Sequence, residues 1–333
     1  MTDKEGVCVP DVLTILIGAS GQYVSGEYLS RCLGVTRSAV WKRIAALKKE
    51  GYFIEASTKK GYCLNPNVNP YGRHAIQNGL TTRTLGRELK FYAQIDSTNT
   101  VLKQLASEGA PEGTVVVADS QIAGRGRLGK NWMSAPEKGI WMSVLLRPPL
   151  HPSEIQSLTL AASVAVCRAL QPLKVQSMGI KWPNDILIGG KKVCGILTEL
   201  SAEAERVAWV VVGIGLNVNH LEQDFPPEIT SIATSLKLSS GSHEQFDRSL
   251  LAARILNALE EVYDFYLQKG SSWMIEEWKC WNLTLGKMVQ LTSQHENLTV
   301  LAYDIMPDGK LVVKKDDGTS LEVLSGEISL REI

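Results

Sequence analysis

Residues 124–132 read Gly-Arg-Gly-Arg-Leu-Gly-Lys-Asn-Trp and follow a strongly β-forming run, TVVVAD, at residues 114–119. Glycines in such a loop let the backbone approach an anion closely, and their N–H groups supply hydrogen-bond donors. Arg125 and Arg127 can each hold two carboxylate or phosphate oxygens, and Trp132 offers a flat surface to a ring. The segment therefore predicts a strand followed by a loop that orders over a nucleotide.

Two common phosphate-binding motifs also match this loop, but each lacks a required element. Gly124, Gly126 and Gly129 satisfy the G-x-G-x-x-G of a dinucleotide fold, which needs a helix to begin at the last glycine. The sequence continues Asn-Trp-Met-Ser-Ala-Pro, which favours a helix poorly. Residues 124–130 also fit G-x-x-x-x-G-K, but Asn131 stands where a phosphate loop needs Ser or Thr. A basic, solvated loop is the remaining alternative.

Length and composition limit the classes of protein that this chain can belong to. Its 333 residues suggest two or three domains. With 44% hydrophobic and 21% charged residues, wholesale disorder, collagen and a coiled-coil rod are excluded. We expect no membrane span and no secretion signal, because long apolar runs and a cationic N-terminal region are both missing. Six scattered cysteines without a C-x-x-C pair favour buried thiols, neither zinc nor disulfides, and a cytoplasmic location.

The basic segment near the N-terminus predicts a DNA-binding module. Residues 31–60 carry eight Lys or Arg and two Glu, a local charge of +6 in a chain of zero net charge. Two helices are predicted around a Gly-containing turn, over residues 26–33 and 37–50, and Val40, Ile44 and Leu47 form one buried stripe on the second. This pattern indicates a helix-turn-helix. A three-helix packing module without DNA is the alternative.

Two β-like runs at residues 52–64, joined by a turn with two lysines, predict a hairpin wing. The side chains that we expect to contact DNA lie on the second helix and in this turn: Arg37, Ser38, Trp41, Lys42, Lys59 and Lys60.

Linkers and turns predict three domains, at residues 1–66, 67–282 and 283–333. Residues 65–72 contain two prolines, three asparagines and a glycine, a composition typical of a linker. The last domain holds four short β-like runs with Asp-Gly turns, which predict a small β-barrel. The whole chain is thus expected to have an α+β fold.

Polar residues beside strands mark the central domain. In Lys181-Trp-Pro-Asn-Asp185, Pro183 is predicted to break a hairpin arm at an edge or bulge, and Asn184 and Asp185 offer oxygens to magnesium or to hydrogen-bond donors. The second arm begins at Lys192, a cation that could face an anionic ligand. A buried strand over residues 208–219 contains Gly213, Gly215, Asn217 and Asn219; its glycines indicate either close approach of a ligand or a bulge.

Four segments in this order resemble the signature blocks of biotin–protein ligases: residues 124–132, 181–185, 192–200 and 213–217. Residues 326–331 resemble the C-terminal cap of that family, and the N-terminal domain is similar to that of the bifunctional ligases that also repress biotin-synthesis operons. The loop departs from the family where Leu128 and Asn131 replace residues that are often basic.

The resemblance implies a mixed-sheet ligase domain like that of class II synthetases, a C-terminal SH3-like barrel, and two-step chemistry. The biotin carboxylate would attack the α-phosphate of ATP, with Mg²⁺, and a lysine of a biotin carboxyl carrier protein would then attack the biotinyl-5′-adenylate. Such a site must supply positive charge and positioning rather than a covalent nucleophile. Operator DNA and a second copy of the chain are the other implied partners. A biotin-sensing regulator without ligase activity and a lipoate-type ligase are the alternatives.

The resemblance also implies roles for individual residues. The catalytic residues would be Arg125, Arg127, Lys192 and Asp185. Biotin would be bound by Ser97, Thr98, Asn99, Gln121, Gly124, Arg125, Gly126, Arg127, Lys192, Gly195, Gly213 and Leu216. ATP would be bound by Trp132, Asn184, Asn217 and Lys181, and Mg²⁺ by Asn184 and Asp185.

Overall fold

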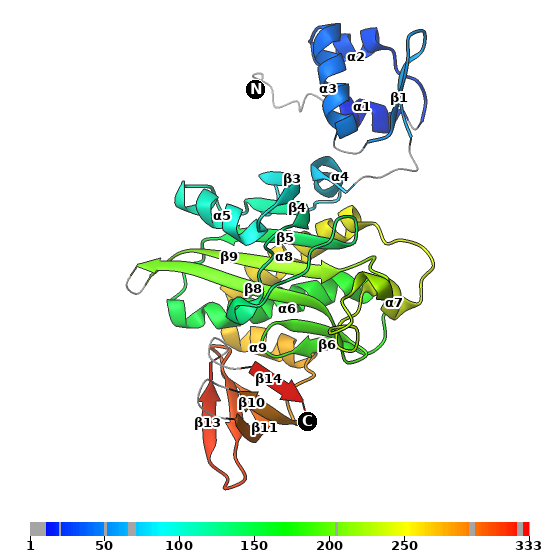
Figure 1. Ribbon diagram of the computed structural model, residues 1–333. Helices are drawn as coiled ribbons and strands as arrows, with labels where there is room; N and C mark the ends of the chain where they lie inside the picture. The colour runs from blue at the N-terminus through cyan, green and yellow to red at the C-terminus, as the bar shows by residue number, and fades with distance from the viewer. Residues whose placement is uncertain are drawn as a thin grey trace. The chain divides into compact units, whose positions relative to one another are not determined.

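A computed structural model gives the fold of the chain (Figure 1). It forms two compact units, Met1–Ala75 and Ile76–Ile333, and each is described by itself. The structure describes residues 11–19, 21–49, 52–65, 71–203, 206–292, 297–324 and 329–332. The three domain boundaries expected from the sequence stay predictions.

The N-terminal unit is a winged helix-turn-helix, as predicted. Its elements are α1 (Val12–Gly18), α2 (Gly26–Leu33), α3 (Arg37–Lys49), β1 (Ile54–Ser57) and β2 (Gly61–Leu64). The Ser25 hydroxyl accepts a hydrogen bond from the Tyr28 backbone N–H at 3.0 Å and so begins α2. Gly34, with φ 62°, ends that helix in the left-handed conformation that suits glycine. The two strands pair antiparallel around the Lys59–Lys60 turn.

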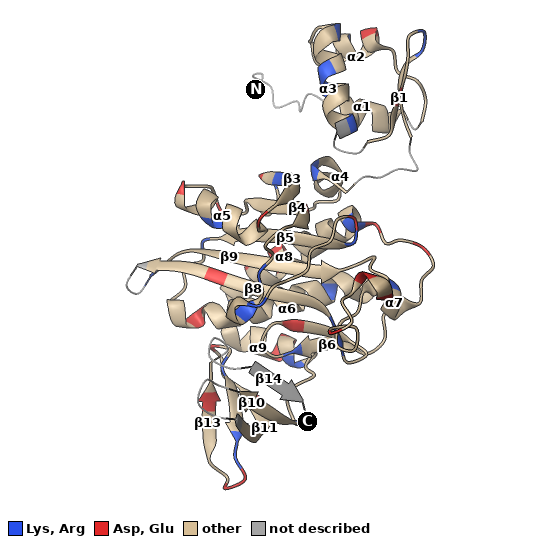
Figure 2. Cartoon of the chain, viewed as in Figure 1, with Lys and Arg blue, Asp and Glu red and all other residues tan. Residues whose placement is uncertain are grey.

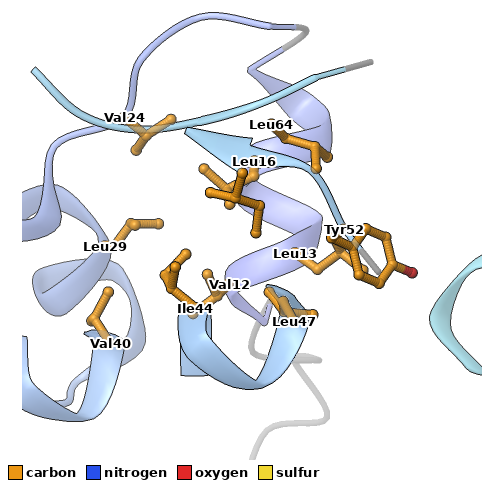
Figure 3. Packing of buried hydrophobic residues seen from close by; sticks show 11 residues of the cluster. Val12, Leu13, Leu16, Val24, Leu29, Val40, Ile44, Leu47, Tyr52 and Leu64 are labelled. Atoms are coloured by element: carbon orange, nitrogen blue, oxygen red, sulfur yellow. The ribbon is translucent and has the colours of Figure 1, made fainter. Parts of the chain in front are cut away.

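Apolar side chains from both helices and strands meet in one core in this unit (Figure 3). Val40, Ile44 and Leu47 all point into it, so the stripe predicted on the second helix is confirmed. Burying each such side chain contributes roughly 1.5–3 kcal/mol. The opposite face of α3 is left to solvent.

The second unit is built on a mixed sheet, as predicted. Within the described residues seven strands pair in the order β3-β4-β5-β9-β8-β7-β6. Only β3 and β4 are parallel, and the other neighbours are antiparallel. The strands are β3 (Leu89–Ile95), β4 (Val115–Gln121), β5 (Gly139–Leu146), β6 (Met178–Lys181), β7 (Asp185–Ile188), β8 (Lys191–Glu203) and β9 (Arg206–Asn217).

Helices lie on both faces of this sheet (Figure 1). The helices of this part of the chain are α5 (Thr98–Ser107), α6 (Ile155–Leu170), α7 (Leu236–Ser240), α8 (Arg248–Lys269) and α9 (Ser271–Lys279), and α4 (Arg73–Asn78) spans the boundary between the two units. Leu102 of α5 packs against Leu145 and Val211 on one face. The Thr159 hydroxyl of α6 lies 2.8 Å from that of Thr198, whose neighbour in the sheet is Val212, so α6 covers the other face. α5 shields only part of its face, and the candidate site residues lie beside it.

The Pro183 region differs from its prediction. We expected one hairpin arm interrupted at an edge or bulge, whereas residues 182–184 form a turn between two strands, β6 and β7. These strands pair antiparallel with Lys181 opposite Asp185. β7 then continues through Gly189 and Gly190 into β8, as predicted.

The C-terminal region forms an antiparallel sheet in the order β13-β12-β11-β10-β14. Its strands are β10 (Met288–Thr292), β11 (Asn297–Ile305), β12 (Leu311–Lys314), β13 (Ser320–Val323) and β14 (Ser329–Glu332). The described residues show no pairing between β13 and β14, so the expected barrel is not closed there. The buried Trp182 indole donates to the Gly309 carbonyl at 3.0 Å and so ties this sheet to the Pro183 turn.

The five described cysteines are free thiols, but not all are buried. Cys167 and Cys194 are buried, and burial raises the pKa of both thiols. The expectation of burial is wrong for Cys32 and Cys280, which are exposed, and for Cys63, which is partly exposed. The sixth cysteine, at position 8, lies outside the described residues. None of the helices within those residues is both long and apolar enough to cross a membrane.

Candidate functional site

A row of side-by-side residues crosses four strands on the face that carries α5. Asp185 of β7 pairs with Gly195 of β8, which pairs with Gly215 of β9, which pairs with Trp141 of β5. The Trp132 indole lies on the two glycines: an added Cβ would come within 2.6 Å of its Nε1 at Gly215 and 2.9 Å of its ring at Gly195. The pairing of β9 is regular through Gly213 and Gly215, so the bulge alternative is wrong, and at Gly215 the chain's own Trp132 ring makes the close approach.

Lys192 lies on the same side of the sheet as Gly195 because of a β-bulge. The register between β7 and β8 shifts after Ile186, which leaves Val193 as an extra residue and turns Lys192 toward the Gly195 side of the sheet. Its Nζ lies 2.7 Å from Asp185 Oδ1 and 5.0 Å from the centroid of the Trp132 ring. The ammonium is thus held by a carboxylate and an aromatic face, and the Lys192 side chain as a whole is one-third exposed.

Arg127 reaches the same place from the glycine-arginine loop. Its Nη1 donates to Asn184 Oδ1 at 3.1 Å, and Asn184 Nδ2 donates to the Ile196 carbonyl at 2.6 Å. Burial lowers the pKa of Arg127, and the negative charge of Asp185 opposes that shift. Arg127 and Lys192 therefore converge beside Asn184 and Asp185.

Arg125 does not join them in this structure. It is exposed, and its side chain makes no hydrogen bond or ion pair with the described residues. The loop closes as a narrow turn in which the Gly126 N–H donates to the Lys130 carbonyl at 2.7 Å and the Trp132 N–H to the Gly124 carbonyl at 2.9 Å. The structure thus brings two of the three predicted cations together.

A buried polar network begins at the N-terminus of α5. Gln121 Oε1 accepts the Thr98 backbone N–H at 2.8 Å, and Gln121 Nε2 donates to the Ser134 hydroxyl at 2.7 Å. Ser143 Oγ lies 2.7 Å from Thr98 Oγ1 and 2.6 Å from Asn99 Oδ1. Ser97, Thr98, Asn99 and Gln121, predicted together, are therefore neighbours.

The side chain of Asn99, predicted to bind biotin, is hydrogen-bonded to other residues of the protein. Its Nδ2 donates to Glu199 Oε2 at 2.7 Å, and an added Cβ at Gly213 would lie only 2.2 Å from its Oδ1. Glu199 and Ser143 were missed in the sequence analysis. Residues 195 and 199 share one face of a regular strand, so the alternation of β8 could have identified Glu199.

Three other predicted residues lie around this row. Lys181 is the register partner of Asp185 and so shares its face. Asn217 lies at the end of β9, where its Nδ2 donates to the Thr234 carbonyl at 3.1 Å. Leu216 is fully buried between Gly215 and Asn217, so its side chain lies on the opposite face and only its backbone can meet a ligand beside Trp132.

The donor set at Asn184 and Asp185 does not fit a magnesium ion held by the protein. Asn184 Oδ1 accepts from Arg127, and Asp185 is paired with Lys192. The described residues contain no cluster of three His, Cys, Asp or Glu that could hold a metal. Two cations beside one carboxylate instead favour phosphate oxygens.

An aromatic wall, missed by the sequence analysis, continues from Trp132. Its ring lies 6.4 Å from that of Trp141, which lies 6.0 Å from His220, and His220 stacks on Phe225 at 5.1 Å. His220 is buried, and its Nδ1 has no hydrogen-bond partner among the described residues.

Burial lowers the pKa of His220 to about 4. Asp224 opposes this shift, whereas Lys138 and Arg248 add to it. The imidazole is therefore neutral at pH 7.

The predicted DNA-contacting residues lie on exposed parts of the N-terminal unit. Figure 2 shows Lys and Arg on α3 and at the β1–β2 turn. Trp41 is 62% exposed, although an indole is largely apolar. The Arg37 guanidinium pairs with Glu27 at 2.7 Å, and Lys60 Nζ lies 5.5 Å from the Tyr23 ring centroid. Ser38, Lys42 and Lys59 are also exposed.

Comparison with known families covers most of the chain. Residues 91–217 match the biotin/lipoate A/B protein ligase family, residues 10–63 match an HTH domain, and residues 284–331 match the biotin protein ligase C terminal domain.

Individual proteins are similar over nearly the whole length. The bifunctional ligase/repressor BirA of Bacillus spizizenii is 39% identical over 96% of this chain and 98% of its own length. The protein of the same name from Escherichia coli is 28% identical over 97% of each chain. A solved biotin protein ligase from Aquifex aeolicus, in complex with biotin and ATP, matches with a TM-score of 0.63 and 31% identity, and it covers 74% of this chain and 100% of that one.

Proposed function

This chain belongs to the family of bifunctional biotin–protein ligases that carry a repressor domain, and we propose that biotin and ATP react beside Arg127, Lys192 and Asp185. As a member of this family it is an ATP-dependent biotin ligase with a DNA-binding helix-turn-helix. The observation that carries the proposed site is the placement of two cations beside the adjacent residues Asn184 and Asp185, with Lys192 Nζ 2.7 Å from Asp185 and Arg127 3.1 Å from Asn184.

The first step joins two anions that repel each other. A biotin carboxylate oxygen attacks the α-phosphorus of ATP, the bond to the bridging oxygen of the β-phosphate breaks, and pyrophosphate leaves. Lys192 neutralises the carboxylate and the α-phosphate, and Arg127 binds the phosphate oxygens as charge moves toward the leaving group. Arg125 joins them when the loop orders over the ligand. Asn184 and Asp185 are already engaged, so these residues would hold no Mg²⁺ of their own, and any Mg²⁺ would be supplied with ATP.

The second step uses Asp185. The adenylate takes over Lys192 as its counter-ion, which releases the carboxylate that Lys192 holds now. Asp185 then accepts a proton from the incoming carrier lysine, whose amine attacks the acyl carbon and expels AMP. The carrier is a biotin carboxyl carrier protein.

The two ends of biotin require different surroundings. Ser97, Thr98 and Gln121 hold the neutral ureido head with hydrogen bonds, and the carboxylate reaches the cations. Trp132, whose ring lies over the glycine row, and the strand end at Asn217 enclose the adenine.

The N-terminal unit acts on operator DNA. α3 enters the major groove, and Lys59 and Lys60 of the hairpin turn bind phosphates. Two copies of the chain bind paired half-sites when the adenylate orders the loop, so that biotin supply controls repression in the cytoplasm.

Mass spectrometry of a purified carrier domain tests the ligase activity. After incubation with the enzyme, ATP and biotin, we expect a mass increase of one biotinyl group on one lysine. An unmodified carrier, together with biotin-dependent binding to operator DNA, would instead support a regulator without ligase activity.

Calorimetry with biotin and with lipoate separates the biotin ligase from a lipoate-type ligase, because only a ureido-binding site prefers biotin.

A further inference from the structure

A chain of polar side chains runs from Glu199 on β8 to Thr98 at the start of α5. Glu199 accepts from Asn99 at 2.7 Å, Asn99 Oδ1 lies 2.6 Å from Ser143 Oγ, and Ser143 Oγ lies 2.7 Å from Thr98 Oγ1. Ser143 is fully buried, and Thr98 and Asn99 are each 4% exposed. In such surroundings an unpaired polar atom is costly, so each proton must go to an acceptor.

The direction of this chain follows from its charged end. A carboxylate only accepts hydrogen bonds, so Asn99 must present its Nδ2 to Glu199 and its Oδ1 to Ser143. The Ser143 hydroxyl has a single proton, and it donates this proton to Asn99 Oδ1, 2.6 Å away, because an amide oxygen can only accept. The geometry also allows Ser143 to donate to Thr98 at 2.7 Å, but its one proton cannot serve both contacts, so with that proton on Asn99 the Thr98 hydroxyl donates to Ser143.

Gln121 does not compete strongly for that proton. Its Oε1 already accepts the Thr98 backbone N–H at 2.8 Å, and the Thr98 hydroxyl lies farther away, at 3.1 Å. With its proton turned toward Ser143, Thr98 Oγ1 keeps its lone pairs for another donor.

We propose that Glu199 is a positioning residue for biotin: through Asn99 and Ser143 it makes the Thr98 hydroxyl an acceptor for a ureido N–H. The inference rests on the proposed function, because a cyclic urea has two N–H donors and one carbonyl acceptor. If Ser143 donated to Thr98 instead, the Thr98 proton would be left to point either to Gln121 Oε1, 3.1 Å away, or toward the ligand, so the hydroxyl would no longer be fixed as an acceptor. Lys103 Nζ, 2.5 Å from the second Glu199 oxygen, supports the carboxylate but does not set the direction.

The Glu199→Gln variant tests this inference. The glutamine has the same size, but its amide can also donate, so Asn99 can turn over and the chain loses its single direction. We expect the Kd of biotin, measured by calorimetry, to rise about tenfold, which corresponds to about 1.4 kcal/mol. The kcat at saturating biotin and the thermal unfolding midpoint should stay close to those of the wild type.

Matched controls show whether the loss comes from the direction of the hydrogen bonds, from the charge of the carboxylate or from altered packing. Lys103→Met removes the ion pair but leaves the bond to Asn99, and Glu108→Gln removes a carboxylate at the exposed end of α5, so both should bind biotin within about twofold of wild type. Glu199→Asp, which keeps an acceptor, should bind biotin more tightly than Glu199→Gln.

A double-mutant cycle with Thr98→Val provides the decisive comparison. If Glu199 acts through the Thr98 hydroxyl, Glu199→Gln should cause no further loss of biotin affinity in the Thr98→Val background. Additive losses, or wild-type affinity in Glu199→Gln, would overturn the inference. Failure of the wild-type chain itself to bind biotin would instead reject the proposed function.

Discussion

The two ends of the proposed biotin site are built in opposite ways. At the charged end, Lys192 is one-third exposed and its carboxylate partner, Asp185, is one-quarter exposed. At the neutral end, Thr98, Asn99 and Ser143 are buried and hydrogen-bonded to one another. The neutral end is therefore preorganised, whereas the ion pair at the charged end must be broken before the ligand can bind. Rigid recognition of the head and adaptable charge at the reacting atoms are thus separated along one sheet face.

Removing the cations of the charged end should have the largest effect. Lys192→Ala and Arg127→Ala each remove a positive charge from the reacting phosphate, so we expect biotin-dependent pyrophosphate exchange to fall about 10²–10³-fold. Lys191→Ala is the matched control, because Lys191 lies next in the strand but donates to the Thr230 carbonyl at the surface. Near-normal exchange in both Lys192→Ala and Arg127→Ala would contradict the proposed roles.

The glycines beneath the two ends should respond differently to an added methyl group. At Gly213 the new Cβ would lie 2.2 Å from Asn99 Oδ1, which cannot move without breaking the buried network. Gly213→Ala should therefore lower the free energy of unfolding by about 1–3 kcal/mol and weaken biotin binding. Denaturant unfolding and calorimetry measure these two effects.

The added methyl group in Gly215→Ala meets the Trp132 ring instead, whose Nε1 has no hydrogen-bond partner among the described residues and so breaks none if the ring moves. We expect a smaller loss of stability than in Gly213→Ala, and a rise in the KM for ATP that exceeds the rise in the Kd for biotin. Equal losses of stability in the two alanine variants would mean that the charged end is as rigid as the neutral end.

His220, in the aromatic wall beside the charged end, predicts a pH effect on stability. Its pKa is about 4 in the native protein and about 6.5 ordinarily, so the unfolded chain binds the proton first as the pH falls. Its contribution to stability is complete above pH 6.5 and is lost progressively toward pH 4. Between pH 7.5 and pH 5 we expect a loss of about 1–2 kcal/mol from this residue.

Chemical denaturation of the wild type and of His220→Phe at both pH values checks this effect, because the phenylalanine variant has no proton to bind. The same pH dependence in both proteins would show that His220 is not buried as a neutral group.

Much of this organisation could be predicted from local sequence. The β-forming run before Gly124, the stripe on α3 and the chemistry of Arg127 and Lys192 are all local properties, and they led to the correct fold class and to the cations that converge. The contacts of Ser143 and Glu199 could not be predicted, because they depend on which strands become neighbours. The orientation of Lys192 depends on a bulge that composition does not reveal.

Raising the salt concentration should change biotin affinity at the charged end but not at the neutral end, and this effect should be smaller than those of the substitutions. The cations near Asp185 are partly exposed, so raising the ionic strength from about 0.05 to 0.5 M should screen their attraction for the biotin carboxylate and raise the Kd of biotin about threefold. Biotinol, in which an alcohol replaces the carboxylate, depends only on the neutral end. Its Kd should stay constant, because hydrogen bonds among buried groups are screened little by salt. Calorimetric titration of both ligands over this range measures the difference. A parallel loss of affinity for both ligands would mean that the ureido end is also exposed to solvent ions, and the contrast between a preorganised head site and an adaptable charged site would fail.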